Sequence, residues 1–245
     1  ENLFDFLPEG KRVSVLKVMT DLQTKMAEAL AGGGRPDPRI IAKAQKEMEQ
    51  AVKQMLTPAE ALDFDLRMSM TANSLRTQIA GFDPSEEEFL KVFQLRKPFD
   101  DEFSPMLRAN ETEADRRRRE EAEKQLKEQI KQSLGPQRYA EYERAQDYSY
   151  QQIYSSVKSA ELGTAAANQV YEMKKLADEQ ARKIRSDRTM TAEQRTSTLN
   201  AIRQETEKSL QGVLGEKGWE QYNRPMNTRW LNNMTPAPRP APTNP

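Results

Sequence analysis

Apolar residues recur along the chain at the spacing expected of amphipathic helices. Four such runs advance in steps of three or four residues: Val15, Met19, Leu22, Met26 and Ala29; Ile41, Ala44, Met48, Ala51 and Met55; Val170, Met173, Ala177, Ala181 and Ile184; Leu199, Ile202, Thr206, Leu210 and Val213. Each run forms a narrow apolar stripe, which a helix buries against one or two partner helices. No segment alternates with period two, so strands are not expected. The pattern predicts an all-α fold of antiparallel helical hairpins.

A short cassette occurs three times at nearly even intervals. It reads MLTPAEALDFDLR at 55–67, SLGPQRYAEYERA at 133–145 and VLGEKGWEQYNR at 213–224. The matching positions within the cassettes are Leu56, Leu134 and Leu214, which lie 78 and 80 residues apart; Ala61, Tyr139 and Trp219; and Phe64, Tyr142 and Tyr222. Upstream of two cassettes, Val92 aligns with Val170 in the same way.

This period predicts three tandem helical hairpin repeats and a tail. The expected boundaries are 1–81, 82–161 and 162–229 for the repeats and 230–245 for a proline-rich tail. Each cassette would supply a helix cap and an aromatic wedge where one hairpin joins the next. The expected body is elongated or curved.

Helix start signals agree with this organisation. Thr57 with Glu60 and Thr191 with Gln194 have the spacing of a capping box, and the segment 83–86, DPSE, is interpreted as a third start. Pro38 begins a helix after the glycine break at 32–34. Pro98 lacks a backbone donor and is expected to kink or end its helix.

Composition removes several function classes. The chain has 245 residues, with 38 basic and 38 acidic side chains, and it contains neither cysteine nor histidine. Zero net charge favours neither nucleic acid nor an anionic membrane as partner. The missing residue types exclude disulfides, thiolate nucleophiles and histidine-based catalytic or metal sites. We therefore predict no catalytic residue, no metal and no cofactor. No segment approaches the roughly 18 apolar residues of a membrane helix, so direct membrane insertion is not expected.

The charge clusters are interpreted as solvated helix faces. Four consecutive arginines, 116–119, precede Glu120, Glu121 and Glu123 at the spacing of helical ion pairs. The acidic runs 86–88 and 100–102 could suggest paired catalytic carboxylates or a hard-metal site. Successive helix residues point about 100° apart, so such runs do not converge on one ion.

Aromatic residues and prolines near the C-terminal half provide the candidate binding residues. Five of the seven tyrosines lie between 139 and 154, and they either fill the junction of the second and third repeats or form a binding surface. The chain ends in PAPRPAPTNP, which favours polyproline II or disorder, and we expect it to lie on its own helices or on a partner. The candidate protein-binding residues are Trp230, Leu231, Pro236, Pro238, Pro240, Pro242, Tyr148, Tyr150 and Tyr154.

Two capped helix starts, LTPAE at 56–60 and MTAEQ at 190–194, resemble the LTxxQ signature of the periplasmic proteins related to Spy and CpxP. The resemblance implies α-helical hairpins, a periplasmic location and binding of unfolded client proteins. The first copy ends in Glu60 instead of glutamine, and the histidine on which the metal-sensing members rely is absent. Since the chain begins at Glu1, we also expect a leader to have been removed.

These observations predict a non-enzymatic, exported helical scaffold that binds other proteins. An accessory subunit of a larger assembly is the preferred role, and a periplasmic chaperone-like protein is the alternative. A homo-oligomer is left open. A carboxylate-dependent hydrolase is the rival class, and it would need a buried carboxylate with a strongly raised pKa.

Overall fold

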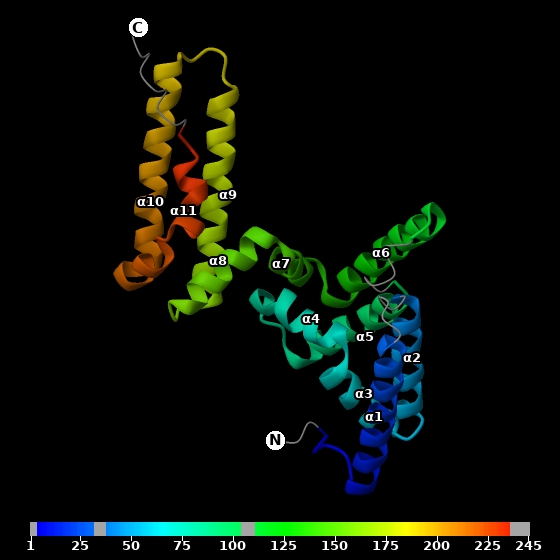
Figure 1. Cartoon of the computed structure of the whole chain (residues 1–245). Coiled ribbons are helices and arrows are strands. Elements are labelled where there is room, and N and C mark those ends of the chain that lie inside the picture. Colours follow the sequence, from blue (N-terminus) through cyan, green and yellow to red (C-terminus); the bar gives the residue numbers. More distant parts are fainter. Residues whose placement is uncertain (1–3, 32–37, 104–110, 236–245) are drawn as a thin grey trace. The chain divides into compact units, whose positions relative to one another are not determined.

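The computed structural model describes residues 4–31, 38–103 and 111–235, and in these ranges every regular element is a helix (Figure 1). The prediction of an all-α fold is confirmed. The first helices are α1 (Glu9–Ala31), α2 (Pro38–Lys53), α3 (Pro58–Met68), α4 (Met70–Gln78) and the 3₁₀ helix η1 (Ala80–Phe82). Those that follow are α5 (Glu86–Glu102), α6 (Glu113–Leu134), α7 (Pro136–Gln146), α8 (Tyr148–Ser159), α9 (Thr164–Ser186), α10 (Ala192–Tyr222) and α11 (Pro225–Asn232).

The chain forms two compact units that interleave in sequence. Unit 1 comprises Glu1–Thr77 and Pro84–Tyr139, and unit 2 comprises Gln78–Asp83 and Ala140–Pro245. The short segment 78–83 therefore belongs with helices that follow it by more than fifty residues. The repeat boundaries expected from the sequence are a different division, and they stay a prediction.

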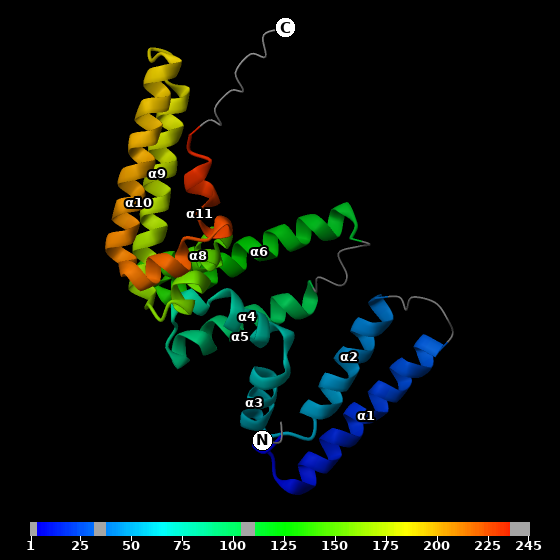
Figure 2. The same ribbon diagram turned by 60° about the vertical axis from the view of Figure 1, so that its left-hand side comes forward.

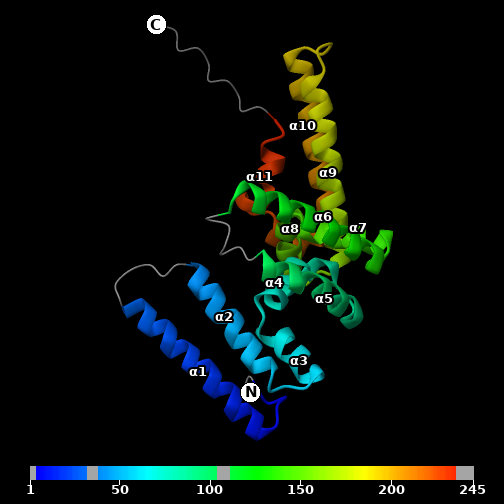
Figure 3. The same ribbon diagram turned by 90° about the vertical axis from the view of Figure 1, so that its right-hand side faces the viewer.

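In unit 1, α1 and α2 lie side by side and run in opposite directions (Figure 3). One end of this pair packs against α3 and the N-terminal segment through an apolar cluster of Phe4, Leu7, Val15, Val52 and Phe64. Phe4 and Phe64 stack with ring centroids 6.4 Å apart. The cassette aromatic Phe64 therefore fills the base of the first helix pair, as a wedge would.

In unit 2, α9 and α10 form the longest helix pair, and α8 and α11 pack against it (Figure 2). The inner face of α9 is made of small residues, with Ala167, Val170, Ala177 and Ala181 all buried. Small side chains let neighbouring helix backbones approach closely, and Leu199 and Leu210 of α10 are fully buried.

The helix starts match the sequence at two of the three predicted capping boxes. Thr57 with Glu60 and Thr191 with Gln194 both make the reciprocal hydrogen bonds. The third predicted start was two residues too early: Ser85 is the cap and pairs with Glu88, while Asp83 has a left-handed backbone with φ 49°. A serine directly before the helix outcompetes an aspartate two residues earlier.

Pro98 does not end its helix, so of the two expected outcomes, a kink or an end, the end is wrong. α5 continues through it to Glu102. A proline inside a helix removes one backbone hydrogen bond, and here the turn that follows is held by side chains, since Lys97 binds Asp101 and Arg96 binds Asp100.

Candidate functional site

Tyr150 is a core residue of unit 2. Its side chain is fully buried, and its hydroxyl lies 2.7 Å from Asn168 Oδ1 and 3.1 Å from the Gly81 carbonyl oxygen. Its ring meets Tyr171 edge-on at 5.3 Å and stacks with Tyr154 at 6.3 Å. Burial raises the pKa of Tyr150 above its usual value. This tyrosine thus joins η1, α8 and α9 within unit 2.

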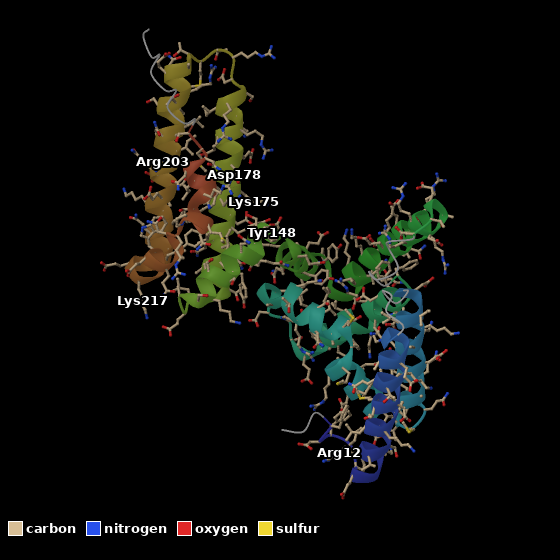
Figure 4. All side chains as sticks on the ribbon, viewed as in Figure 1. Arg12, Tyr148, Lys175, Asp178, Arg203 and Lys217 are labelled. Carbon is tan, nitrogen blue, oxygen red and sulfur yellow. The ribbon has the colours of Figure 1, made fainter. Side chains whose placement is uncertain are left out.

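Tyr148 and Tyr154 are the more accessible tyrosines of α8. Tyr148 is 74% exposed, and its hydroxyl accepts a hydrogen bond from Gln152 Nε2 on the same helix (Figure 4). Tyr154 is half-buried beneath Lys158 Nζ, 5.8 Å from the ring centroid. Of the three predicted tyrosines, Tyr148 is the most exposed, and its role in binding a partner stays a prediction.

Trp230 and Leu231 fix α11 onto its own unit. Leu231 is buried, and Trp230 is half-buried with its indole N–H 3.4 Å from the Tyr222 hydroxyl. Lys174 of α9 lies 5.3 Å from a ring centroid of Trp230. Arg185 donates to the carbonyl oxygens at the C-terminal end of α11. Both predicted anchors therefore have intramolecular contacts, and their role in binding a partner stays a prediction.

The prolines Pro236, Pro238, Pro240 and Pro242 lie outside the described residues. Their proposed role in binding, and the expectation that the tail lies on a surface, stay predictions.

The acidic runs are tied into local structure. Glu88 closes the α5 capping box and receives two hydrogen bonds from Arg138, at 2.6 and 2.7 Å. These contacts lower the pKa of Glu88 to about 2, with the Arg138 hydrogen bond as the largest cause. In the second run, Asp100 accepts from the Thr71 hydroxyl and Asp101 from Lys97. Neither run is arranged as a pair of free carboxylates.

The arginine run of α6 is also paired with carboxylates. Arg116 and Arg119 reach Glu120 and Glu123 at the expected i,i+4 spacing, with N–O distances of 3.8 and 3.9 Å. The tighter contacts run toward the N-terminus, where Glu113 lies 2.8 Å from Arg116. Further pairs are Arg117 with Glu113, Arg118 with Glu102 and Arg119 with Glu111. This run therefore presents little uncompensated positive charge.

A chain of five charged residues crosses unit 1, and sequence reasoning missed it. Its members alternate in sign: Asp65, Lys53, Glu49, Lys97 and Asp101. Burial raises the pKa of Asp65, although Lys53 lies 2.7 Å away. The i,i+4 spacing of Lys97 and Asp101 was the available signal, but the partner on α2 is fixed only by the fold.

Within the residues that the structure describes, no group of three or more His, Cys, Asp or Glu side chains is arranged to hold a metal ion. Over the same ranges, no helix is both long enough and apolar enough to span a bilayer.

Several large apolar side chains remain on the surface. On the α1–α2 pair, Val13, Leu16 and Ile40 are 63%, 42% and 59% exposed. Elsewhere among the described residues, Met70, Leu176 and Met226 are exposed, as is Tyr148. The sequence offered a signal here, because Val13, Leu16 and Ile40 lie outside the apolar stripes of their helices.

Searches against protein-family models, curated proteins and solved structures found no match for this chain. The resemblance to the LTxxQ proteins therefore stays a prediction, and function must be argued from the residues.

Proposed function

We propose that the chain is a non-enzymatic, exported helical scaffold that binds other proteins as an accessory subunit of a larger assembly. The observation that carries this proposal is a set of exposed apolar side chains on the α1–α2 pair. Val13 and Leu16 are exposed near the start of α1, and Ile40 is exposed near the start of α2. Apolar side chains at such exposure suit contact with another protein, since their removal from water favours association.

The shape of the scaffold is proposed as three tandem repeats, supported by equivalent burial and backbone geometry. The valines near the start of each first helix, Val15, Val92 and Val170, are all fully buried. The cassette aromatics Phe64, Tyr142 and Tyr222 are buried as well. In the part of the chain that the structure describes, the residues with positive φ fall in two pairs, Asp83 with Glu161 and Gly135 with Gly215, separated by 78 and 80 residues. A positive φ is uncommon, and its recurrence at the spacing of the repeats supports a connection of the same backbone geometry between successive helix pairs.

The exported location rests on the LTxxQ-like helix starts. Thr57 and Thr191 both form the complete capping box that this signature contains. Cell fractionation of the native source tests the location, and recovery of the chain with cytoplasmic markers would contradict it.

Copurification from the native source tests the binding role. A fixed partner at constant stoichiometry, measured by native mass spectrometry, is the expected result for an accessory subunit. Leu16→Asp and Ile40→Asp place charges at two of these exposed apolar positions, and at least one of them should release the partner. Ser14→Asp is the matched control, because Ser14 is exposed on α1 but points away from Leu16. Retention of the partner by both Leu16→Asp and Ile40→Asp would reject these positions as the contact.

A chaperone-like role is the second candidate, and the methionines of unit 1 favour it. Met19, Met48 and Met55 are only partly buried against the α1–α3 cluster. Flexible methionine side chains adapt to varied apolar partners. Suppression of the aggregation of several unrelated unfolded proteins would support this role, and suppression of none would exclude it.

The hydrolase alternative lacks support from the charged residues. Burial raises the pKa of Asp65, but this carboxylate is paired with Lys53 at 2.7 Å. A carboxylate held by a lysine in a structural ion pair has no free proton to donate.

A further inference from the structure

A buried lysine joins α5 to α2. Lys97 Nζ lies 2.8 Å from Glu49 Oε1 and 2.6 Å from Asp101 Oδ2, and its side chain is 9% exposed. Glu49 also pairs with Lys53 at 2.7 Å, and Lys53 with Asp65 of α3 at 2.7 Å. Positive and negative groups therefore alternate from α5 through α2 to α3.

Different contacts hold the helices together on the two sides of this ion-pair chain. On one side, α1, α2 and α3 share the apolar cluster, whose last member in the sequence is Met68. On the other side, α4 is joined to α5 by the Thr71–Asp100 hydrogen bond of 2.9 Å and by Arg76 over the Phe89 ring. The described residues between 4 and 68 thus form one body, which we call the α1–α3 body, and α4 with α5 forms another.

The covalent link between the two bodies is short. Ser69 alone separates α3 from α4, and it is extended, with φ −71° and ψ 143°. Arg76 also reaches back to the Leu66 carbonyl, 2.6 Å away, at an exposed position. The Lys97–Glu49 pair also crosses the boundary, and the Lys97 side chain is buried. Separating the bodies would take Glu49 away from Lys97 and leave Asp101 as the carboxylate bound to the ammonium. The loss of one of two charge partners at a buried site is unfavourable, so this pair resists separation of the bodies.

We propose that the Lys97–Glu49 ion pair is a latch that holds the α1–α3 body against α5, and that breaking it lets this body pivot about Ser69. The latch sets the direction in which the exposed apolar residues of α1 and α2 face relative to α5.

A comparison inside the chain supports the assignment. Seventy-eight residues later, Lys131, Glu143, Lys175 and Glu179 keep the charges of Lys53, Asp65, Lys97 and Asp101. The position equivalent to Glu49 is Lys127. Lys175 is exposed where Lys97 is buried. Lys97 is therefore buried where the acidic partner Glu49 is present, and Lys175 is exposed where a lysine takes that position. The latch is accordingly specific to the contact between α2 and α5.

The absence of cysteine makes the distance across the latch directly measurable. Lys46→Cys on α2 and Gln94→Cys on α5 are exposed sites in the two bodies, and both can carry nitroxide labels. Double electron–electron resonance on the doubly labelled full chain reports the distribution of distances between them. The wild-type background should give a single narrow maximum.

Three further changes on this labelled background decide the proposal. Glu49→Lys introduces the residue found at position 127, and Lys97→Met removes the cation while keeping an unbranched chain of similar length. Both should broaden the distribution or add a second maximum. Glu47→Lys makes the same charge change at an exposed site on α2 and should leave the single maximum unchanged.

A narrow, unshifted distribution in Lys97→Met would overturn the latch, as would a broad distribution in the wild-type background. Helicity measured by circular dichroism separates pivoting from unfolding, since only unfolding lowers it. If Glu49→Lys unfolds, Lys97→Met gives the decision, because methionine needs no ionic partner when buried.

Discussion

At the scale of single residues, close contacts and charge partners decide how the helices meet. Gly81 shows this most directly: a Cβ atom built there would lie 2.5 Å from Cε1 of Tyr150. The Tyr150 hydroxyl is held by Asn168, so the ring has little freedom to retreat. A hydrogen in place of a side chain is what lets η1 lie against α8.

We predict that Gly81→Ala lowers the stability of the chain by about 1–3 kcal/mol, the usual cost of overpacking a buried contact. Thermal unfolding followed by circular dichroism is the measurement. Gly212→Ala is the control, because its Cβ would meet nothing within 4 Å and alanine favours the helix. Equal melting temperatures for the two variants would mean that the ring moves aside freely.

Glu88 should make stability depend on acid pH. Its pKa is lowered to about 2, so its ionised form stabilises the folded chain fully above pH ~4.5 and progressively less as pH falls toward 2. Partial exposure screens this contribution to about 1 kcal/mol. Urea unfolding at pH 7 and pH 3 should show a smaller pH effect in Glu88→Gln than in wild type. Glu87→Gln alters an exposed neighbour and should retain the wild-type difference.

At the scale of elements, α11 is held by a few side chains and not by its length. Thr228, Leu231 and Met234 are buried, and Arg185 binds the carbonyls at its end. A helix of eight residues has little stability of its own, so these contacts must supply it.

We therefore expect Leu231→Ala to cost about 2–3 kcal/mol and to release α11 from the α9–α10 pair. Limited proteolysis should then cut within residues 225–235 at a protease concentration that leaves the wild type intact. Met226→Ala lies on the same helix but is 79% exposed, and it should change neither stability nor cleavage. Identical digestion of both variants would show that other contacts hold α11.

At the scale of the whole molecule, the two units interleave in sequence, because a short segment of unit 2 lies between the two segments of unit 1. Phe82 lies in the first third of the chain, yet its ring packs edge-on against Tyr142 in unit 2, 5.9 Å away. In unit 1, Phe4 is a buried member of the apolar cluster that α1, α2 and α3 share.

Two core variants should separate the units by hydrogen exchange. Phe82→Ala is expected to cost about 3–5 kcal/mol and to speed amide exchange in α8 and α9 while leaving α1 and α2 unchanged. Phe4→Ala should do the reverse. Mass spectrometry of the exchanged, digested chain gives the result, and equal acceleration everywhere in either variant would mean that the units unfold together.

Local interactions made much of the fold readable from the sequence. The 3–4 spacing of apolar residues predicted helices, and the capping boxes at Thr57 and Thr191 predicted two of their starts, because both depend on residues within one or two turns. The cassette alignment also found Phe64, Tyr142 and Tyr222, all of them buried. What the sequence determined by itself is therefore the helical class and the aromatic positions that recur between helices.

The tertiary structure alone decided which distant groups meet. Leu231 was predicted from the sequence to bind a partner, but it is buried against its own unit. Lys97 is buried and pairs with Glu49, which lies 48 residues away in the sequence. Spacing along one helix carries no information about the partner that another helix brings. Burial and ion pairing between helices arise only when the chain has folded, because they depend on which faces the packing brings together.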